Sequence, residues 1–192
     1  RVEECAGEAR EHPRAAEGRR DLRDLPTFTI DPVTAKDFDD AISAEDLGDG
    51  RARVWVHIAD VSAHVRPGDP IDREAERRGT SVYVPGAVEP MLPQALSNDA
   101  CSLVPGRDRL VVTTEMEFDG TDVAKVSFYR AVIRSDERLD YDRVDRIFAG
   151  REEASFSGRR SVEVDVPLVD ALRMWFNDRP IDPRGQVGVP RK

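Results

Sequence analysis

At Asp31-Pro-Val-Thr-Ala-Lys-Asp37-Phe-Asp39-Asp40, four carboxylates stand within ten residues, directly after the short strand-like run Thr27-Phe-Thr-Ile30. Four acids this close repel one another, and folding them together without a partner costs free energy through raised pKa values. A cation relieves that cost, and an all-oxygen ligand set suits Mg²⁺, or Mn²⁺ as a substitute, better than zinc. The stretch therefore predicts a divalent-metal site that handles phosphate.

Other kinds of chemistry compete for these acids. An EF-hand calcium loop needs Gly at its sixth position and Glu at its twelfth, but counting from Asp37 gives Ile42 and Gly48, and counting from Asp31 fails as well. An aspartyl-phosphate enzyme needs its nucleophile directly after a buried strand, whereas Asp37 follows Thr-Ala-Lys. Two-metal phosphoryl chemistry fits the spacing. From composition alone, a solvated acidic turn with Asp31 as a cap stays open.

Length and charge describe an acidic, folded chain. Its 192 residues suffice for one domain with a real core, or for two small ones. The net charge of −9 argues against a simple basic nucleic-acid clamp, although a bound metal would invert the local charge. No apolar run approaches the roughly 20 residues that span a membrane, and the polar N-terminus is not a signal peptide. We therefore expect a cytoplasmic protein without membrane contacts.

The ends of the chain differ in composition from its middle. Residues 1–25 are rich in Glu, Arg and Ala and predict a polar linker or solvated helix, or a connection to an upstream domain. Because the sequence begins at Arg1 without Met, we expect a processed or excised segment. Residues 26–178 predict the folded domain, and residues 179–192, with three prolines and two glycines, predict an irregular tail. Cys5 and Cys101 lack metal-ligand spacing and predict reduced thiols.

Two hairpins dominate the folded part. Strand patterns flank Gly48-Asp-Gly50, and longer ones, over 109–118 and 123–134, flank Asp119-Gly120. The alternation of Val54, Trp55, Val56, His57 and Ile58 predicts burial on both faces, and Leu110, Val112, Met116 and Phe118 share one face of the next strand. The pattern indicates antiparallel pairing.

Residues that typically start and stop helices predict the helical part of the fold. Asp69, Pro70 and Gly79 bound a predicted helix over 70–78, and Asp140 and Gly150 bound another. A third helical stripe consists of Leu168, Leu172, Trp175 and Phe176, and a short strand is predicted over Ser81-Val-Tyr-Val84. The fold class is therefore mixed α/β, with a largely antiparallel sheet, hairpins and packed helices.

Further blocks follow the acidic stretch, which continues as Ala41-Ile42. They are Val56-His-Ile-Ala-Asp-Val61, Arg78-Gly-Thr-Ser-Val-Tyr83, Pro90-Met-Leu-Pro93, Leu96-Ser and Cys101-Ser-Leu103. In this order, across about residues 21–150, the blocks resemble the catalytic (RNB) domain of the ribonuclease II and ribonuclease R family.

That resemblance implies a Mg²⁺ site at the end of a narrow RNA channel. It implies processive 3′→5′ hydrolysis of single-stranded RNA to nucleoside 5′-monophosphates. Asp31, Asp37 and Asp40 match metal-site ligands of the family. Asp39 matches the most critical carboxylate, which holds a metal and the attacking water.

Two tyrosines match aromatic residues of the family that contact RNA. Tyr141 matches one beside the scissile end, and Tyr83 one that stacks on a base farther away. Stacking tolerates any base and contributes about 1–3 kcal/mol per base, which suits an enzyme that accepts any RNA. The structural alternatives are a strand core residue for Tyr83 and an exposed first-turn residue for Tyr141. His57, between apolar strand residues, is expected to satisfy a buried hydrogen bond rather than to bind metal.

The resemblance covers the N-terminal part of that catalytic domain. Full-length relatives also carry OB-fold RNA-binding domains and a C-terminal half that supplies a glutamate, an arginine and a second stacking aromatic. None of these can be placed after residue 150. Two hypotheses follow: a Mg²⁺-dependent exoribonuclease of which this chain is a piece, or a non-catalytic RNA-binding or scaffold relative that keeps the aspartates. The intact set of four acids favours the enzyme.

Overall fold

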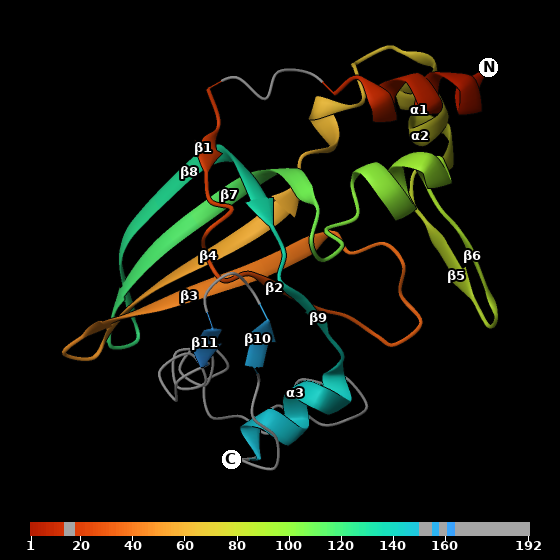
Figure 1. The fold of residues 1–192 in the computed structure, drawn as a ribbon. Helices are drawn as coiled ribbons and strands as arrows, with labels where there is room; N and C mark the ends of the chain where they lie inside the picture. The colour runs from red at the N-terminus through yellow and green to blue at the C-terminus, as the bar shows by residue number, and fades with distance from the viewer. Residues whose placement is uncertain (14–17, 150–154, 158–160, 164–192) are drawn as a thin grey trace, which may run out of the picture.

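The computed structural model describes residues 1–13, 18–149, 155–157 and 161–163, and within them the chain is built around a seven-stranded sheet (Figure 1). The strand order is β1-β8-β7-β4-β3-β2-β9. These strands are β1 (Arg20–Asp21), β2 (Phe28–Ile30), β3 (Asp40–Gly48), β4 (Arg51–Ala59), β7 (Asp108–Asp119), β8 (Asp122–Arg134) and β9 (Glu137–Leu139). The β1–β8 and β2–β9 pairs are parallel and the other neighbours antiparallel, which confirms the predicted fold class.

Both predicted hairpins form. The β3–β4 turn places Gly48, Asp49 and Gly50 at positive φ, a conformation that glycine adopts at little cost. Gly120, also at positive φ, closes the β7–β8 hairpin. Two smaller hairpins lie outside the large sheet. They consist of β5 (Val82–Val84) with β6 (Ala87–Glu89), and of β10 (Ser155–Ser157) with β11 (Ser161–Glu163).

Two helices begin at the capping residues predicted from the sequence. Helix α2 (Pro70–Arg78) begins where the Asp69 carboxylate accepts hydrogen bonds from the amides of Ile71 and Asp72, and it ends at left-handed Gly79. Asp140 caps α3 (Tyr141–Phe148) in the same way through the amide of Arg143. The remaining helical segments are α1 (Val2–Glu11), the 3₁₀ turn η1 (Val61–Ala63) and the π-helical turn η2 (Leu96–Ala100). Among the described helices, none has the length and apolar character that crossing a bilayer requires.

Residues 1–25 are not a solvated linker in their described part, contrary to our expectation. Ala6 of α1 is fully buried in the main core, and α1 packs beside α2 (Figure 1). Farther along, Arg19 forms a buried ion pair with Asp60, with 2.6 Å between Arg19 Nη2 and Asp60 Oδ2. The apolar positions of α1 are mostly small, so the sequence alone gave no strong sign that this helix packs on the domain.

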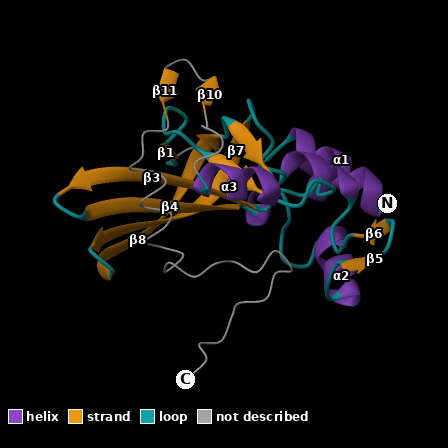
Figure 2. Cartoon of the chain, turned by 90° about the horizontal axis from the view of Figure 1, so that it is seen from below, coloured by secondary structure: helices purple, strands orange, loops and turns teal. Residues whose placement is uncertain are grey.

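Helices cover the two faces of the sheet unequally. Because side chains alternate across a strand, the register separates Ala41, Val111 and Ala131, which join the main core with α1 and α2, from Ile42 on the opposite face. On that second face, α3 packs Val144 and Ile147 near Phe28, Leu139 and Ile42. Figure 2, seen from below, shows α3 in front of the strands.

Beyond α3, the second face of the sheet is apolar, and within the described part of the chain it is open. It exposes Ile58, Val112, Val123, Val126 and Phe128, of which Phe128 is 73% exposed. The predicted burial on both faces of β4 therefore fails at Ile58. In β7 the predicted apolar face is this open one, while Val111 and Thr113 on the other face are buried. The predicted helix over Leu168–Phe176 and the tail 179–192 lie outside the described residues.

His57 anchors a buried polar chain across the sheet. Its Nε2 lies 3.2 Å from Ser43 Oγ and its Nδ1 lies 2.9 Å from Thr113 Oγ1. Ser43 Oγ in turn lies 2.8 Å from Thr27 Oγ1, so strands β3, β4 and β7 and the residue before β2 are linked by side chains. All four residues are buried. The predicted buried hydrogen bond of His57 is confirmed.

Burial lowers the pKa of His57 from 6.5 to about 4. Between those values the unfolded chain binds a proton that the folded chain does not, so the free energy of unfolding rises with pH across this window, by about 3 kcal/mol in full. We therefore expect His57→Gln to destabilise the protein most near pH 7 and progressively less toward pH 4. Urea unfolding of both proteins from pH 4 to 7.5 measures this. A constant difference would contradict it.

Candidate metal and RNA site

The four aspartates are gathered where β2 passes into β3. Asp31 directly follows β2, Asp40 is the first residue of β3, and Asp37 and Asp39 lie in the loop between them. Because β2 and β3 pair antiparallel, with Phe28 opposite Ile42, the two ends of this loop lie on neighbouring strands. We call residues 31–40 the acidic loop.

The negative charges of the neighbouring acids act on Asp31 and Asp39. The pKa of Asp31, of Asp39 and of Asp40 is raised, in each case chiefly by burial. For Asp39 the negative charges of Asp37, Asp40 and Asp31 add to the rise. This is the response expected of carboxylates that share a site without a counter-ion.

One oxygen of this cluster is both buried and without a partner. Asp31 is only 8% exposed, and its Oδ2 has no hydrogen-bond partner. An unpaired buried carboxylate oxygen is costly, and together with three neighbouring carboxylates it forms the hard donor set that Mg²⁺ or Mn²⁺ prefers. The donor chemistry thus fits such an ion. Within the described residues, however, no three acidic, His or Cys side chains already converge closely enough to hold one.

Ser102 is the main anchor of the acidic loop. Its fully buried hydroxyl accepts a hydrogen bond from the Phe38 amide at 3.1 Å and donates one to the Lys36 carbonyl at 2.9 Å. The next residue, Leu103, donates its amide to the Phe38 carbonyl at 2.8 Å. At the following residue of the loop, the Asp39 carbonyl accepts a hydrogen bond from the Ala59 amide at 2.9 Å. The backbone on both sides of Asp37 and Asp39 is therefore fixed.

No pattern in the sequence indicated a function for Ser102. It belongs to the block Cys101-Ser-Leu103, and its spacing from the acidic loop in sequence gives no sign of contact. Its neighbour Cys101 is buried, which raises the pKa of the Cys101 thiol to about 12 and agrees with a packing role. Both Cys101 and Cys5 are free thiols, as predicted.

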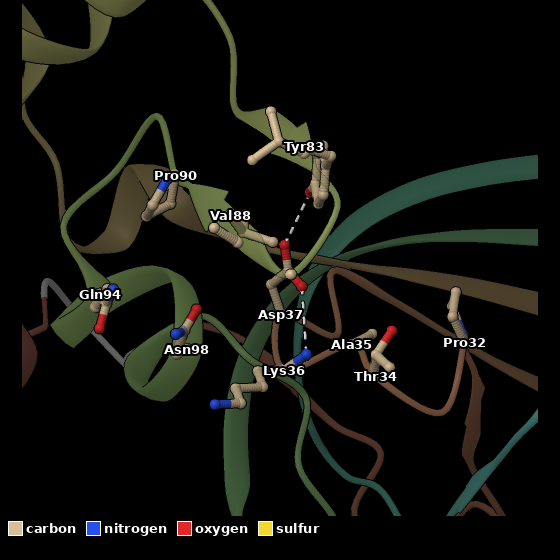
Figure 3. A pocket seen from close by; sticks show the side chains of 13 residues that line it. Pro32, Thr34, Ala35, Lys36, Asp37, Tyr83, Val88, Pro90, Gln94 and Asn98 are labelled. Carbon is tan, nitrogen blue, oxygen red and sulfur yellow. Dashed lines mark hydrogen bonds between the residues drawn. The ribbon is translucent and has the colours of Figure 1, made fainter.

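Tyr83 reaches the acidic loop from the β5–β6 hairpin. Its hydroxyl donates a hydrogen bond to Asp37 Oδ2 at 2.9 Å, and its ring is exposed (Figure 3). The hairpin is held at its base by Arg78, which donates to Glu89 Oε1 and to the Pro90 carbonyl. The structural alternative for Tyr83, a strand core residue, is therefore wrong. The sequence predicted β5 but missed its partner β6.

A cavity of about 530 Å³ lies between the hairpin and the acidic loop (Figure 3). It is lined by Pro32, Thr34, Ala35, Lys36, Asp37, Tyr83, Val84, Gly86, Ala87, Val88, Pro90, Gln94 and Asn98. The lining combines the aromatic ring of Tyr83 and apolar side chains with the amides of Gln94 and Asn98, the ammonium of Lys36 and the carboxylate of Asp37. This mixture suits a ligand with flat apolar surfaces, hydrogen-bonding edges and a negative charge.

Tyr141 is not brought to this cavity. It occupies the first turn of α3, is 57% exposed and does not line the pocket. Of the two predicted RNA-contacting tyrosines, the described structure thus joins only Tyr83 to the aspartates.

Comparison with known proteins places this chain in a family. The sequence profile of the RNB domain matches residues 19–174. The chain belongs to the RNB family. It is 49% identical over 177 residues to ribonuclease R of Escherichia coli strain K12, an alignment that covers 91% of this chain and 21% of that enzyme. The chain therefore spans about a fifth of the length of this curated relative.

Solved structures agree with the RNB assignment. Ribonuclease R of Mycoplasma genitalium, in complex with ribose-methylated single-stranded RNA, superposes with a TM-score of 0.79 at 33% identity over 91% of this chain and 27% of its own. Yeast Ssd1, a pseudonuclease, superposes with a TM-score of 0.69 at 21% identity over 87% of this chain and 20% of its own. The fold of this chain thus also occurs in a pseudonuclease, so the fold alone does not show activity.

We predict that Ser102→Ala will lower the free energy of unfolding by about 1–3 kcal/mol, because the Phe38 amide and Lys36 carbonyl lose their partner. Chemical denaturation measures the loss. Ser135→Ala is the matched control, since Ser135 is equally buried but donates only over 3.5 and 3.3 Å. Equal losses in the two variants would contradict an anchoring function for the Ser102 hydroxyl.

Proposed function

We propose that this chain carries the acidic site of a Mg²⁺-dependent 3′→5′ exoribonuclease, which hydrolyses single-stranded RNA to nucleoside 5′-monophosphates in the cytoplasm. The observation that carries the proposal is the clustering of four carboxylates, one with a buried unpaired oxygen, beside a cavity that bears an exposed aromatic ring. Phosphodiester hydrolysis needs both a charged metal site and a surface that holds the nucleic acid next to it.

In the proposed site, Asp31, Asp37, Asp39 and Asp40 would hold the metal. When bound, Mg²⁺ supplies an activated water and stabilises the negative charge that develops at the phosphate. The chain's own contribution is positioning. The Asp39 carbonyl is fixed by the Ala59 amide, and the Phe38 peptide by Ser102 and Leu103, so the carboxylates project from a braced backbone.

RNA would approach through the cavity. The exposed ring of Tyr83 offers a stacking platform that accepts any base. Gln94 and Asn98 can each donate and accept hydrogen bonds, so they can contact different base edges, while Lys36 suits a phosphate. None of these lining residues recognises the hydrogen-bonding pattern of one particular base. The cavity therefore suits single-stranded RNA in general rather than one RNA sequence.

A second candidate function is a non-catalytic RNA-binding or scaffold protein that retains the aspartates. The observation in its favour is the shared fold of Ssd1, a pseudonuclease. Against it stands the electrostatic cost of the cluster, since four unneutralised acids are expensive to keep where no ion is bound. We therefore favour the enzyme.

We propose further that the open face of the sheet packs against polypeptide that the longer relatives have beyond the matched region, including the C-terminal half of the catalytic domain. OB-fold RNA-binding domains are expected elsewhere in such a relative. The chain covers only 21% of the Escherichia coli enzyme, and α3 already packs on the adjacent part of this face. Asp40 shares its cross-strand row with Ile58 and Val112, so a partner on this face would lie next to the acidic cluster.

The activity is tested on 5′-labelled single-stranded RNA, with Mg²⁺ or with EDTA. We expect a ladder that shortens from the 3′ end only with the metal, and a loss of about a hundredfold or more in Asp39→Asn, because a metal-holding carboxylate becomes neutral. Asp46→Asn, in the remote end of β3, is the control and should be fully active. Undiminished release by Asp39→Asn would exclude the enzyme, and RNA retained without turnover, even with Mg²⁺ and with the C-terminal half of the catalytic domain restored, would favour the scaffold.

The open face predicts self-association of the isolated chain. We expect Phe128→Lys to reduce association in sedimentation velocity experiments while changing the free energy of unfolding by less than about 0.5 kcal/mol, because the ring is already exposed. Ser127→Lys places the same charge on the opposite face of β8 and should leave association unchanged. Association that persists in Phe128→Lys would show that this face is not adhesive.

A further inference from the structure

Arg138 of β9 contacts both ends of the acidic loop. It lies opposite Thr29 in the parallel β2–β9 pair, one strand from the loop. Its Nη2 donates a hydrogen bond to the Pro32 carbonyl at 2.6 Å, at the start of the loop. Its guanidinium carbon lies 5.1 Å from the centroid of the Phe38 ring, near the end of the loop. One planar group therefore spans the segment from Pro32 to Phe38, which carries Asp37 and lies between Asp31 and Asp39.

The same guanidinium supplies a positive charge beside the cluster. Burial and the charges of Asp40 and Asp37 raise the pKa of Asp31, whereas Arg138 acts in the opposite direction. Arg138 Nε is buried without a hydrogen-bond partner, as is Asp31 Oδ2. Arg138 is half-buried, and a guanidinium with a buried, unpaired Nε is costly; its position here is understandable because it offsets repulsion among the acids.

We propose that Arg138 is a positioning residue that braces the backbone of the acidic loop before any ion binds. The metal half of this proposal rests on the proposed function, while the bracing of the metal-free loop does not. Arg138 acts through its contacts with Pro32 and Phe38. The carboxylates, and not Arg138, would contact the reacting atoms.

Lysine cannot replace arginine in this position. A guanidinium is planar and can stack on Phe38 while its edge donates to Pro32, whereas an ammonium is a compact point charge on a flexible stem. Arg138→Lys therefore preserves the charge next to the metal site and removes the brace. This separation matters because loss of a positive charge alone would strengthen metal binding and hide the loss of positioning.

Arg20→Lys is the matched control. The Arg20 guanidinium carbon lies 3.8 Å from the centroid of the Tyr129 ring, and its Nη1 lies 3.5 Å from Glu115 Oε2. Arg20 thus combines a stacked ring with a neighbouring carboxylate, as Arg138 does, but it lies in β1, at the other edge of the sheet.

The experiment has two readouts on the intact chain. The first is amide hydrogen exchange of the metal-free protein over residues 32–38, which include the Ala35 amide bonded to the Pro32 carbonyl and the Phe38 amide bonded to Ser102. We expect exchange in Arg138→Lys to be about tenfold faster there and unchanged in β7 and β8. The second is Mn²⁺ affinity measured by electron paramagnetic resonance, which we expect to weaken about tenfold.

The outcomes separate the two proposals. Wild-type exchange over residues 32–38 in Arg138→Lys would overturn the brace, whatever the metal result. Faster exchange with unchanged Mn²⁺ affinity would overturn its link to the metal site, and equal effects in Arg20→Lys would show that they are not local. Failure of the wild-type chain to bind Mn²⁺ would instead refute the proposed metal site, with the exchange result still deciding the brace. Arg138→Met, which keeps only the stem, should show the faster exchange as well.

Discussion

The structure depends on one electrostatic constraint, the mutual repulsion of four carboxylates held within ten residues. Left to itself, such a segment would spread into solvent, where water screens its charges. Here it is held back by contacts from four other parts of the chain. Ser102 and Leu103 fix its middle, Ala59 fixes Asp39, Arg138 spans its ends and Tyr83 contacts Asp37. Burial is the main cause of the raised pKa values of Asp31, Asp39 and Asp40, and repulsion from neighbouring acids adds to the rise at Asp31 and Asp39.

Local signals in the sequence predicted most of the secondary structure. The cap of α2 needs only Asp69, Pro70 and Gly79, and the hairpin turns need only glycine at positive φ, so both can be recognised within a few residues. The acidic stretch was recognisable for the same reason, since its four members are adjacent. The resemblance to the RNB family added their chemistry, which spacing alone left open between a metal site and a solvated turn.

Contacts between distant segments could not be predicted in this way. Ser102 lies 64 residues from Phe38, and Arg138 lies 106 residues from Pro32. A serine and an arginine are common surface residues, so nothing in their neighbourhoods marks them as anchors. The face of β7 shows the same limit. Alternation identified which residues share a face, but the covering helices decide which face is buried, and they bury Val111 rather than Val112.

The hydrogen bond from Tyr83 to Asp37 joins the two halves of the site. The hydroxyl belongs to an exposed hairpin that forms one wall of the cavity, and the carboxylate belongs to the acidic loop. Its bond to Asp37 is the leading cause of the raised pKa of Tyr83, which keeps the hydroxyl protonated and able to donate. A base that stacked on the Tyr83 ring would contact the β5–β6 hairpin. An ion that bound Asp37 would share this carboxylate with the Tyr83 hydroxyl. In the proposed function, occupation of the cavity and of the metal site would therefore be coupled through the side chain of Tyr83.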